Sequence, residues 1–263
     1  MNLLITCSEL NQLRSSFFPE MLKDCRDLLT FVEKPQGISN ATLFQQLKQG
    51  CRPTSLAKLF AEPRKAHVSI WQRFWLGSFL MHWVWLLHKH QIHLVLSEQQ
   101  TALRLQPNGE VDQFLINLYY TPVHKIAKNG DYLPAYQQLK QFLSPIFTIL
   151  SEHSRLNEAV FWHNTANLIE YSLKQLEQEG VEISTIYAQL FDQKKWGEYE
   201  YNPFHSPVEY IDFPALPFPQ PCRLRKVCCH AQLEPTLDYC GNCPKLKRLC
   251  GEELQALVEK WKG

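Results

Sequence analysis

Four cysteines near the C-terminus are the residues of this chain best suited to chemistry. They follow the pattern Cys228-Cys229-(x10)-Cys240-(x2)-Cys243, in a chain of 263 residues with nine cysteines in all. Thiolates are soft ligands, which favour zinc, copper(I) or an iron–sulfur cluster. A structural zinc site usually takes its thiols from two Cys-x2-4-Cys pairs, and only Cys240 and Cys243 have that spacing. The spacing therefore predicts a metal centre, but not the usual zinc pattern.

The adjacent pair, Cys228 and Cys229, favours a larger metal group. Neighbouring side chains diverge from the backbone, so these two thiols do not easily hold one small tetrahedral ion together. A two-iron cluster takes two thiolates on each iron, and divergent thiols suit it better. The pattern matches neither the bacterial nor the plant-type ferredoxin spacing. A zinc site that staples the C-terminus remains the alternative.

Cationic residues surround the four cysteines. Three precede the first pair and three follow the second: Arg223, Arg225, Lys226, Lys245, Lys247 and Arg248. A [2Fe–2S] centre with four thiolates is net negative, so this rim stabilises it and can attract an anionic partner. Gly241 and Asn242 allow backbone amides to point toward sulfur. Cys222 and Cys250 flank the set, and we interpret them as bystander thiols.

The composition excludes several classes of function. Lys and Arg number 27 against 26 Asp and Glu, a formal net charge of +1, which implies no nucleic acid partner. The strongest apolar stretch, residues 74–87, is shorter than the roughly 20 residues that a membrane-spanning helix needs. We expect a core helix there, with at most peripheral contact with a membrane. Unpaired thiolates suit the reducing cytoplasm.

The hydrophobic pattern predicts a mainly helical α+β fold with a small central antiparallel sheet and a C-terminal cysteine-rich module. Helical spacing predicts helices through the N-terminal third, among them one over residues 53–60, and a long helix over 66–89. Alternating residues predict three short antiparallel strands within residues 92–118. Pro107-Asn108-Gly109 is the turn signal between the last two strands.

Helices are predicted again from Tyr132 onward. Two apolar stripes mark them: Tyr136, Leu139, Leu143, Ile146 and Leu150, then Trp162, Ala166, Ile169, Leu173 and Leu176. Gly180 ends the second helix, and residues 183–191 and 252–261 form shorter ones. Prolines between them forbid a long helix over residues 196–221. We therefore predict a body over 1–195, a Pro- and aromatic-rich linker over 196–221 and a metal-binding module over 222–263.

Other residues that can bind ligands have plainer interpretations. Three histidines lie close in sequence, and four tryptophans lie on one predicted helix: His88, His90, His93, Trp71, Trp75, Trp83 and Trp85. The histidines straddle a junction between a helix and a strand, so we interpret them as solvated or capping residues. An aromatic-rich helix is usually core, and we interpret the tryptophans in that way.

The cysteine pattern and its flanks resemble the cluster signature of the FhuF-type siderophore-iron reductases, which carry an unusual [2Fe–2S] centre. Arg225 before the first pair, Pro235 between the pairs, and Cys243-Pro244 match that family. The segment Trp162-His163-Asn164 and the central hairpin are similar too. The sequence assigns no role to His163 or Asn164.

The resemblance implies an oxidoreductase. A [2Fe–2S] cluster held by Cys228, Cys229, Cys240 and Cys243 would reduce siderophore-bound Fe(III) to Fe(II) and release iron in the cytoplasm. The family suggests a hydroxamate-type ferric siderophore, with the body as its candidate docking region. The chain has no Gly-rich dinucleotide fingerprint, so we expect a separate electron donor such as a ferredoxin or a flavoprotein reductase. The alternatives are a zinc-stapled interaction module without enzymatic activity, and an iron–sulfur electron shuttle or redox sensor.

Overall fold

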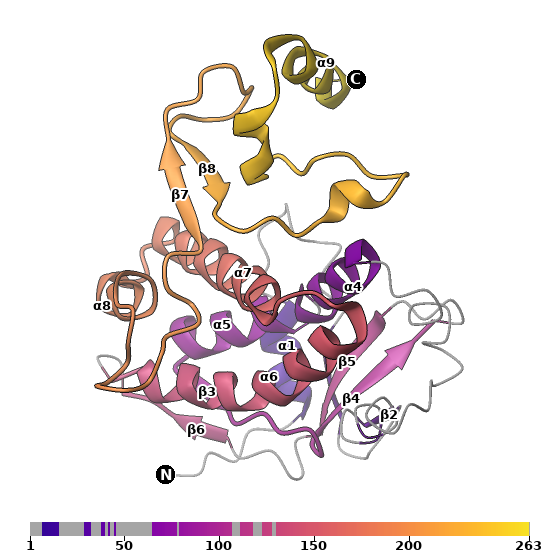
Figure 1. The fold of residues 1–263 in the computed structure, drawn as a ribbon. Helices are drawn as coiled ribbons and strands as arrows, with labels where there is room; N and C mark the ends of the chain where they lie inside the picture. Colours follow the sequence, from indigo (N-terminus) through magenta and orange to yellow (C-terminus); the bar gives the residue numbers. More distant parts are fainter. Residues whose placement is uncertain are drawn as a thin grey trace.

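A computed structural model describes residues 7–15, 29–32, 38–39, 42, 45, 65–77, 79–106, 111–117, 123–127 and 130–262. Within these ranges the chain is mainly helical with small sheets, as the sequence predicts. Figure 1 shows a body of helices and strands, with the C-terminal part of the chain lying over helices α4 and α7. The predicted helix over residues 53–60 lies outside the described residues.

The central sheet has four strands in the order β1-β5-β4-β2. Strands β4 (Thr101–Leu105) and β5 (Val111–Asn117) form the predicted antiparallel hairpin, with Leu103 opposite Phe114. Strand β2 (Ile38–Ser39) joins β4 in antiparallel orientation, and β1 (Leu29–Val32) joins β5 in parallel. Leu29 was expected in a helix. That prediction is wrong, because Leu29 and Phe31 alternate into the core and pair with β5.

The third predicted strand does not join this sheet. Strand β3 (Ile92–Leu94) pairs instead with β6 (Val123–Lys125) in a separate two-stranded sheet. All three residues of β3 are buried, so it lacks a solvent face. The indole Nε1 of Trp83 donates to the carbonyl oxygen of Leu94 at 3.0 Å. The Trp83 side chain of helix α5 (Leu80–Lys89) thus occupies the Leu94 carbonyl, a backbone acceptor that another strand could otherwise use.

The long helix predicted over residues 66–89 is two helices, α4 (Lys65–Gly77) and α5 (Leu80–Lys89). The break follows Gly77, and glycine is a poor helix former. Phe79 lies at the break and is fully buried. Its ring stacks on Phe114 of β5, with 4.3 Å between ring centroids. The break therefore turns an aromatic ring onto the central sheet.

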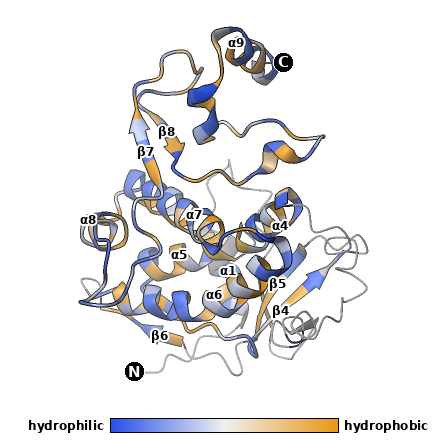
Figure 2. Cartoon of the chain, viewed as in Figure 1, coloured by the Kyte–Doolittle hydropathy of each residue, from blue (hydrophilic) through white to orange (hydrophobic). Residues whose placement is uncertain are grey.

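Helices α6 (Leu133–Ser154) and α7 (Glu158–Gln178) confirm the two predicted stripes. Hydrophobic and hydrophilic residues alternate around both helices in Figure 2. Asn157 caps α7 by accepting a hydrogen bond from the Ala159 amide at 2.8 Å. Gly180 ends this region with a φ of +81°, which glycine adopts readily. Helix α8 (Ser184–Tyr187) and a π-helical turn, η2 (Ala188–Asp192), follow as one short segment.

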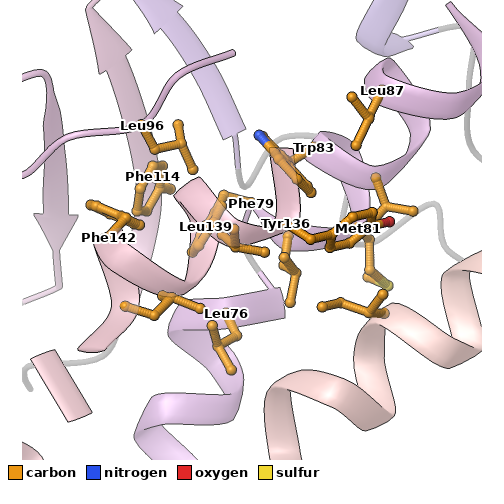
Figure 3. Close-up of a cluster of buried hydrophobic side chains, with 14 of the residues drawn as sticks. Leu76, Phe79, Met81, Trp83, Leu87, Leu96, Phe114, Tyr136, Leu139 and Phe142 are labelled. Carbon is orange, nitrogen blue, oxygen red and sulfur yellow. The ribbon is translucent and has the colours of Figure 1, made fainter. Parts of the chain in front are cut away.

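The main core lies between these helices and the sheet. Figure 3 shows its centre, where Phe79, Phe114 and Phe142 pack beside Leu139 and Leu96. The four tryptophans of α4 and α5 are buried, which confirms that they are core residues. None of the described helices combines the length and the apolar character that crossing a membrane requires.

The C-terminal part has a smaller core of its own. It contains strands β7 (Val208–Ile211) and β8 (Cys222–Arg225), the 3-10 turns η3 (Ala231–Leu233) and η4 (Pro244–Arg248), and helix α9 (Gly251–Lys262). Leu254, Leu257 and Val258 of the predicted last helix pack onto Leu224 and Leu246. The segment predicted as a linker contributes β7, and its Phe204 is fully buried against the main core. The division into body, linker and module stays a prediction.

Candidate metal centre

The structure brings the four predicted cysteines into one contiguous set. Cys228 and Cys229 follow strand β8, and Cys240 and Cys243 precede turn η4. The sulfurs of Cys228 and Cys243 lie 3.9 Å apart. Cys240 lies close enough to Cys229 and Cys243 for both to lower its pKa. Cys229 and Cys243 are almost fully buried, whereas Cys228 and Cys240 are half-buried.

Backbone contacts hold the two pairs together. The Arg225 amide donates to the Asn242 carbonyl at 2.9 Å, which ties the end of β8 to the turn between Cys240 and Cys243. That turn is closed by the Cys243 amide, which donates to the Cys240 carbonyl at 2.9 Å. A side chain at Gly241 would meet the ring of Phe218, since a Cβ there would lie 2.8 Å from the Phe218 ring. A larger residue at this turn would therefore have to displace the Phe218 ring.

The first pair is shaped by a bend directly after it. His230 adopts a left-handed conformation with a φ of 62°. This bend directs the His230 amide toward the Cys228 sulfur at 3.3 Å. Backbone N–H groups that donate to sulfur stabilise a thiolate and the metal group bound to it. The sequence predicted amide donors at Gly241 and Asn242, and the structure shows one at His230.

The contacts among the thiols move their pKa values in opposite directions. Hydrogen bonds from Cys229 and Cys243 lower the pKa of Cys240, and the charges of Arg225 and Arg73 lower it further. The hydrogen bond with Cys243 lowers the pKa of Cys228, and the His230 amide and Lys245 add to this. The hydrogen bonds to their neighbours, followed by burial, raise the pKa of Cys229 and Cys243. Cys228 and Cys240 therefore lose their protons more readily than a free thiol, whereas Cys229 and Cys243 retain theirs.

Two arginines supply positive charge to the thiols. Arg73, from helix α4, donates through Nη1 to the Cys229 sulfur at 3.4 Å. Arg225 is 1% exposed and donates through Nη2 to Oδ1 of Asn164. In the part of the chain that the structure describes, Nε and Nη1 of Arg225 have no hydrogen-bond partner. Burial lowers the pKa of Arg225, and the thiols of Cys229, Cys240 and Cys228 oppose that effect.

This arrangement fits an anionic group bound to the four thiols. A buried guanidinium without a counter-charge is costly, and four metal-bound thiolates would supply that counter-charge. Across the described ranges, no three or more His, Cys, Asp or Glu side chains are arranged to hold a metal ion as they stand. The fit therefore depends on the soft donor set and on Arg225. The assignment of the four cysteines as ligands stays a prediction.

Comparison with known families finds a match to the body of the protein. The family model described as "Ferric iron reductase FhuF-like transporter" matches residues 69–212, more than half of the chain. The chain belongs to this FhuF family. No curated protein matches the chain.

The FhuF family match ends before the four cysteines, but it includes residues that contact Cys229 and the strand before Cys228. Arg73 lies within the matched range, and so does a polar row on helix α7: Asn164, Asn167 and Glu170. Through this row, α7 contacts strand β8, directly before Cys228. The part of the body that matches the family and the C-terminal segment with the four cysteines are thus in direct contact in this FhuF protein.

Sequence reasoning missed most of these neighbours. It named Asn164 without a role, and it did not find Arg73, which lies 156 residues before Cys229. A signal for the polar row did exist. Asn164, Asn167 and Glu170 recur every three residues among apolar positions, which marks a polar contact on an otherwise buried helix side.

The remaining candidates of the sequence lie elsewhere. Cys222 is buried against the Phe213–Gln220 loop, where Gln220 Nε2 donates to its sulfur at 3.0 Å. Cys250 is exposed before α9. His88 and His93 do not converge on one site, because His88 bonds to Tyr136 at 2.9 Å while His93 packs beside His124. Their interpretation as solvated or capping residues is wrong, because both side chains are buried between the helices and the strands that they join.

Proposed function

We propose that this FhuF family protein is a ferric-siderophore reductase in which Cys228, Cys229, Cys240 and Cys243 hold a [2Fe–2S] cluster. One observation carries the proposal: four thiols that shift one another's pKa values lie near a buried arginine, Arg225, whose partner on α7 is the neutral Asn164, in a chain of a ferric iron reductase family. Zinc would use the same ligands, but the adjacent pair and the family both favour the two-iron group.

The proposed reaction is a one-electron reduction. When bound, a [2Fe–2S] cluster supplies one electron at a time and no acid or base. A ferric siderophore holds Fe(III) in hard oxygen ligands, and these bind Fe(II) far more weakly. One electron from the donor protein therefore converts the bound Fe(III) to Fe(II), and the iron leaves the siderophore. In this scheme Arg73, Arg225 and the His230 amide hold negative charge on the sulfurs.

Substrate and donor would approach the half-buried sulfurs, Cys228 and Cys240. Lys65 and Lys245 lie near this edge, since both lower the pKa of His230, after burial. Phe74, Leu233 and Leu237 are exposed on the neighbouring α4 and η3 region. A cationic edge with apolar residues suits an acidic electron carrier, such as a ferredoxin or a flavoprotein reductase, and an oxygen-rich ferric hydroxamate. We place this reaction in the cytoplasm.

The proposal is tested first by spectroscopy. Anaerobically purified protein should show visible bands that bleach with dithionite, with about two irons and two sulfides per chain. The reduced protein should then release Fe(II) from a ferric hydroxamate siderophore, measured with a coloured Fe(II) chelator. A colourless protein with one zinc and no iron, even after anaerobic reconstitution, would leave a zinc-stapled module. A reducible cluster that leaves every ferric siderophore oxidised would leave an electron shuttle or redox sensor.

A further inference from the structure

Helix α7 and strand β8 meet through polar side chains with matched spacing. Asn164, Asn167 and Glu170 follow one another along one side of α7. Arg223 and Arg225 are two residues apart on β8, so both point to the same side of the strand. Arg223 donates through Nε to Oε2 of Glu170 at 2.6 Å and through Nη2 to the Asn167 carbonyl at 3.0 Å. Arg225 donates to Asn164. Each arginine therefore has its own hydrogen-bond partners on helix α7.

Hydrogen bonds to helix α4 fix the orientation of the Asn164 side chain. Its Nδ2 donates to Oγ of Ser69 at 3.1 Å and to Oε1 of Gln72 at 2.8 Å, both on helix α4. Gln72 in turn donates through Nε2 to the Phe161 carbonyl at 3.3 Å. All of these side chains are buried. Because the amide donors are used toward α4, the Asn164 oxygen must face Arg225.

The two arginines differ in what neutralises them. The carboxylate of Glu170 pairs with Arg223, so the positive charge of Arg223 is compensated within the contact between α7 and β8. Arg225 has only a neutral amide oxygen on the helix side. The groups of opposite charge that act on it are the thiols of Cys229, Cys240 and Cys228. Arg225 therefore keeps its charge available to the thiol set, in a buried place where solvent screens little.

We propose that Asn164 and Arg225 set the reduction potential of the group bound by the four cysteines. Asn164 is the positioning residue, and Arg225 supplies the charge. Accepting one electron makes the bound group more negative by one unit. A buried cation near the four thiols favours that reduced form, and the Arg225 amide is bonded to the turn between Cys240 and Cys243. The pair therefore raises the potential and makes the group easier for the donor to reduce. This inference rests on the proposed iron–sulfur function.

The test is the midpoint potential, measured by redox titration of the visible spectrum at constant pH and ionic strength. Arg225→Gln removes the charge, and at the wild-type midpoint the ratio of reduced to oxidised protein should fall about tenfold. A tenfold change corresponds to about 59 mV for a one-electron couple, toward more negative potential. Asn164→Asp keeps the shape but adds a negative charge beside Arg225, and should shift the midpoint in the same direction. Arg225→Lys retains the charge and should recover most of the wild-type value.

Tyr210→Phe is the matched structural control. It removes the hydrogen bond that the neutral Tyr210 hydroxyl donates to Glu170 at the other end of the row, so it loosens the same contact without a change of charge. Its midpoint should stay at the wild-type value. Unchanged midpoints in both Arg225→Gln and Asn164→Asp, or an equal shift in Tyr210→Phe, would overturn the inference. If Arg225→Gln does not fold, Asn164→Asp and Arg225→Lys decide alone. A wild-type protein without iron and sulfide would instead refute the proposed function, and this inference with it.

Discussion

At the scale of single residues, Cys240 is the thiol whose pKa is lowered by neighbours from both sides. Both Cys229, of the adjacent pair, and Cys243, of the second pair, lower its pKa. The charges of both arginines act on it. Cys250 lies only seven positions beyond Cys243, yet it is exposed at the start of α9. The structure thus separates two cysteines that composition alone treats alike.

We expect Cys240→Ser to abolish or strongly change the visible spectrum, because a hydroxyl is a poor substitute for a thiolate as a ligand of iron. Cys250→Ser should leave the spectrum unchanged. Absorbance per chain, together with iron and sulfide content, measures both effects on proteins purified side by side. An equal loss in the two variants would mean that the set of four ligands is drawn wrongly.

Sequence alone predicted the composition of the site but not its surroundings. The four cysteines and Arg225 stand together in the chain, so their spacing and charge could be interpreted directly. Arg73 and Asn164 reach the site only because α4 and α7 pack against the C-terminal part of the chain. No local sequence pattern predicts a contact between residues so far apart in the chain. Such contacts can be identified only once the fold is known.

At the scale of elements, the contact between α7 and the β7–β8 hairpin centres on Glu170. This carboxylate is fully buried on α7. It accepts hydrogen bonds from Tyr210 at 2.6 Å, from Tyr187 at 3.1 Å and from Arg223 at 2.6 Å. Burial, and then the Glu170 carboxylate, raise the pKa of both tyrosines, so they remain neutral donors. A buried charge with this many donors is strongly destabilising to disrupt.

Glu170→Gln should lower the free energy of unfolding by about 3 kcal/mol, because it leaves the Arg223 charge without its counter-ion in a mostly buried contact. Urea denaturation followed by circular dichroism measures the change. Glu177→Gln, on the same helix, is the control. Its partner is Lys174 in an exposed pair, and such pairs contribute at most about 0.5 kcal/mol. Similar losses in both variants would contradict the anchoring role of Glu170.

The elements themselves were predictable where the pattern was local. The stripes of α6 and α7 and the β4–β5 hairpin have strong periodicity, and the structure confirms them. The partner of β3 was not predictable. Its three residues are all buried, so their pattern does not distinguish a core face from a solvent face, and Trp83 also bonds to the Leu94 carbonyl. Leu29 shows the same limit, because pairing with β5 overrides a helical spacing.

At the scale of the whole molecule, buried histidines make stability depend on pH. Burial lowers the pKa of His88 from 6.5 to about 3 and that of His93 to about 4. His88 joins α5 to α6 through the Tyr136 hydroxyl. Because the folded pKa lies below the unfolded value, the neutral histidine favours folding. This stability is complete above pH 6.5 and is lost as the pH falls toward the folded pKa.

Lowering the pH from 7.5 to 5 should therefore reduce the free energy of unfolding by about 2 kcal/mol through His88 alone. Urea midpoints at the two pH values measure the difference. His88→Gln cannot titrate, so the loss between the two pH values should be smaller in that variant by about this amount. An identical loss in wild type and variant would show that other groups govern the acid sensitivity.

The contact of Arg73 with Cys229 also decides whether the site can be transplanted. A peptide of residues 222–263 carries all four cysteines, the turn at Gly241 and helix α9. It lacks Arg73, which comes from α4, and Asn164, which orients Arg225. A protein engineer who grafts only this peptide onto another scaffold would move the four cysteines and leave behind the charges that act on them. The smallest portable unit includes α4 and α7 as well.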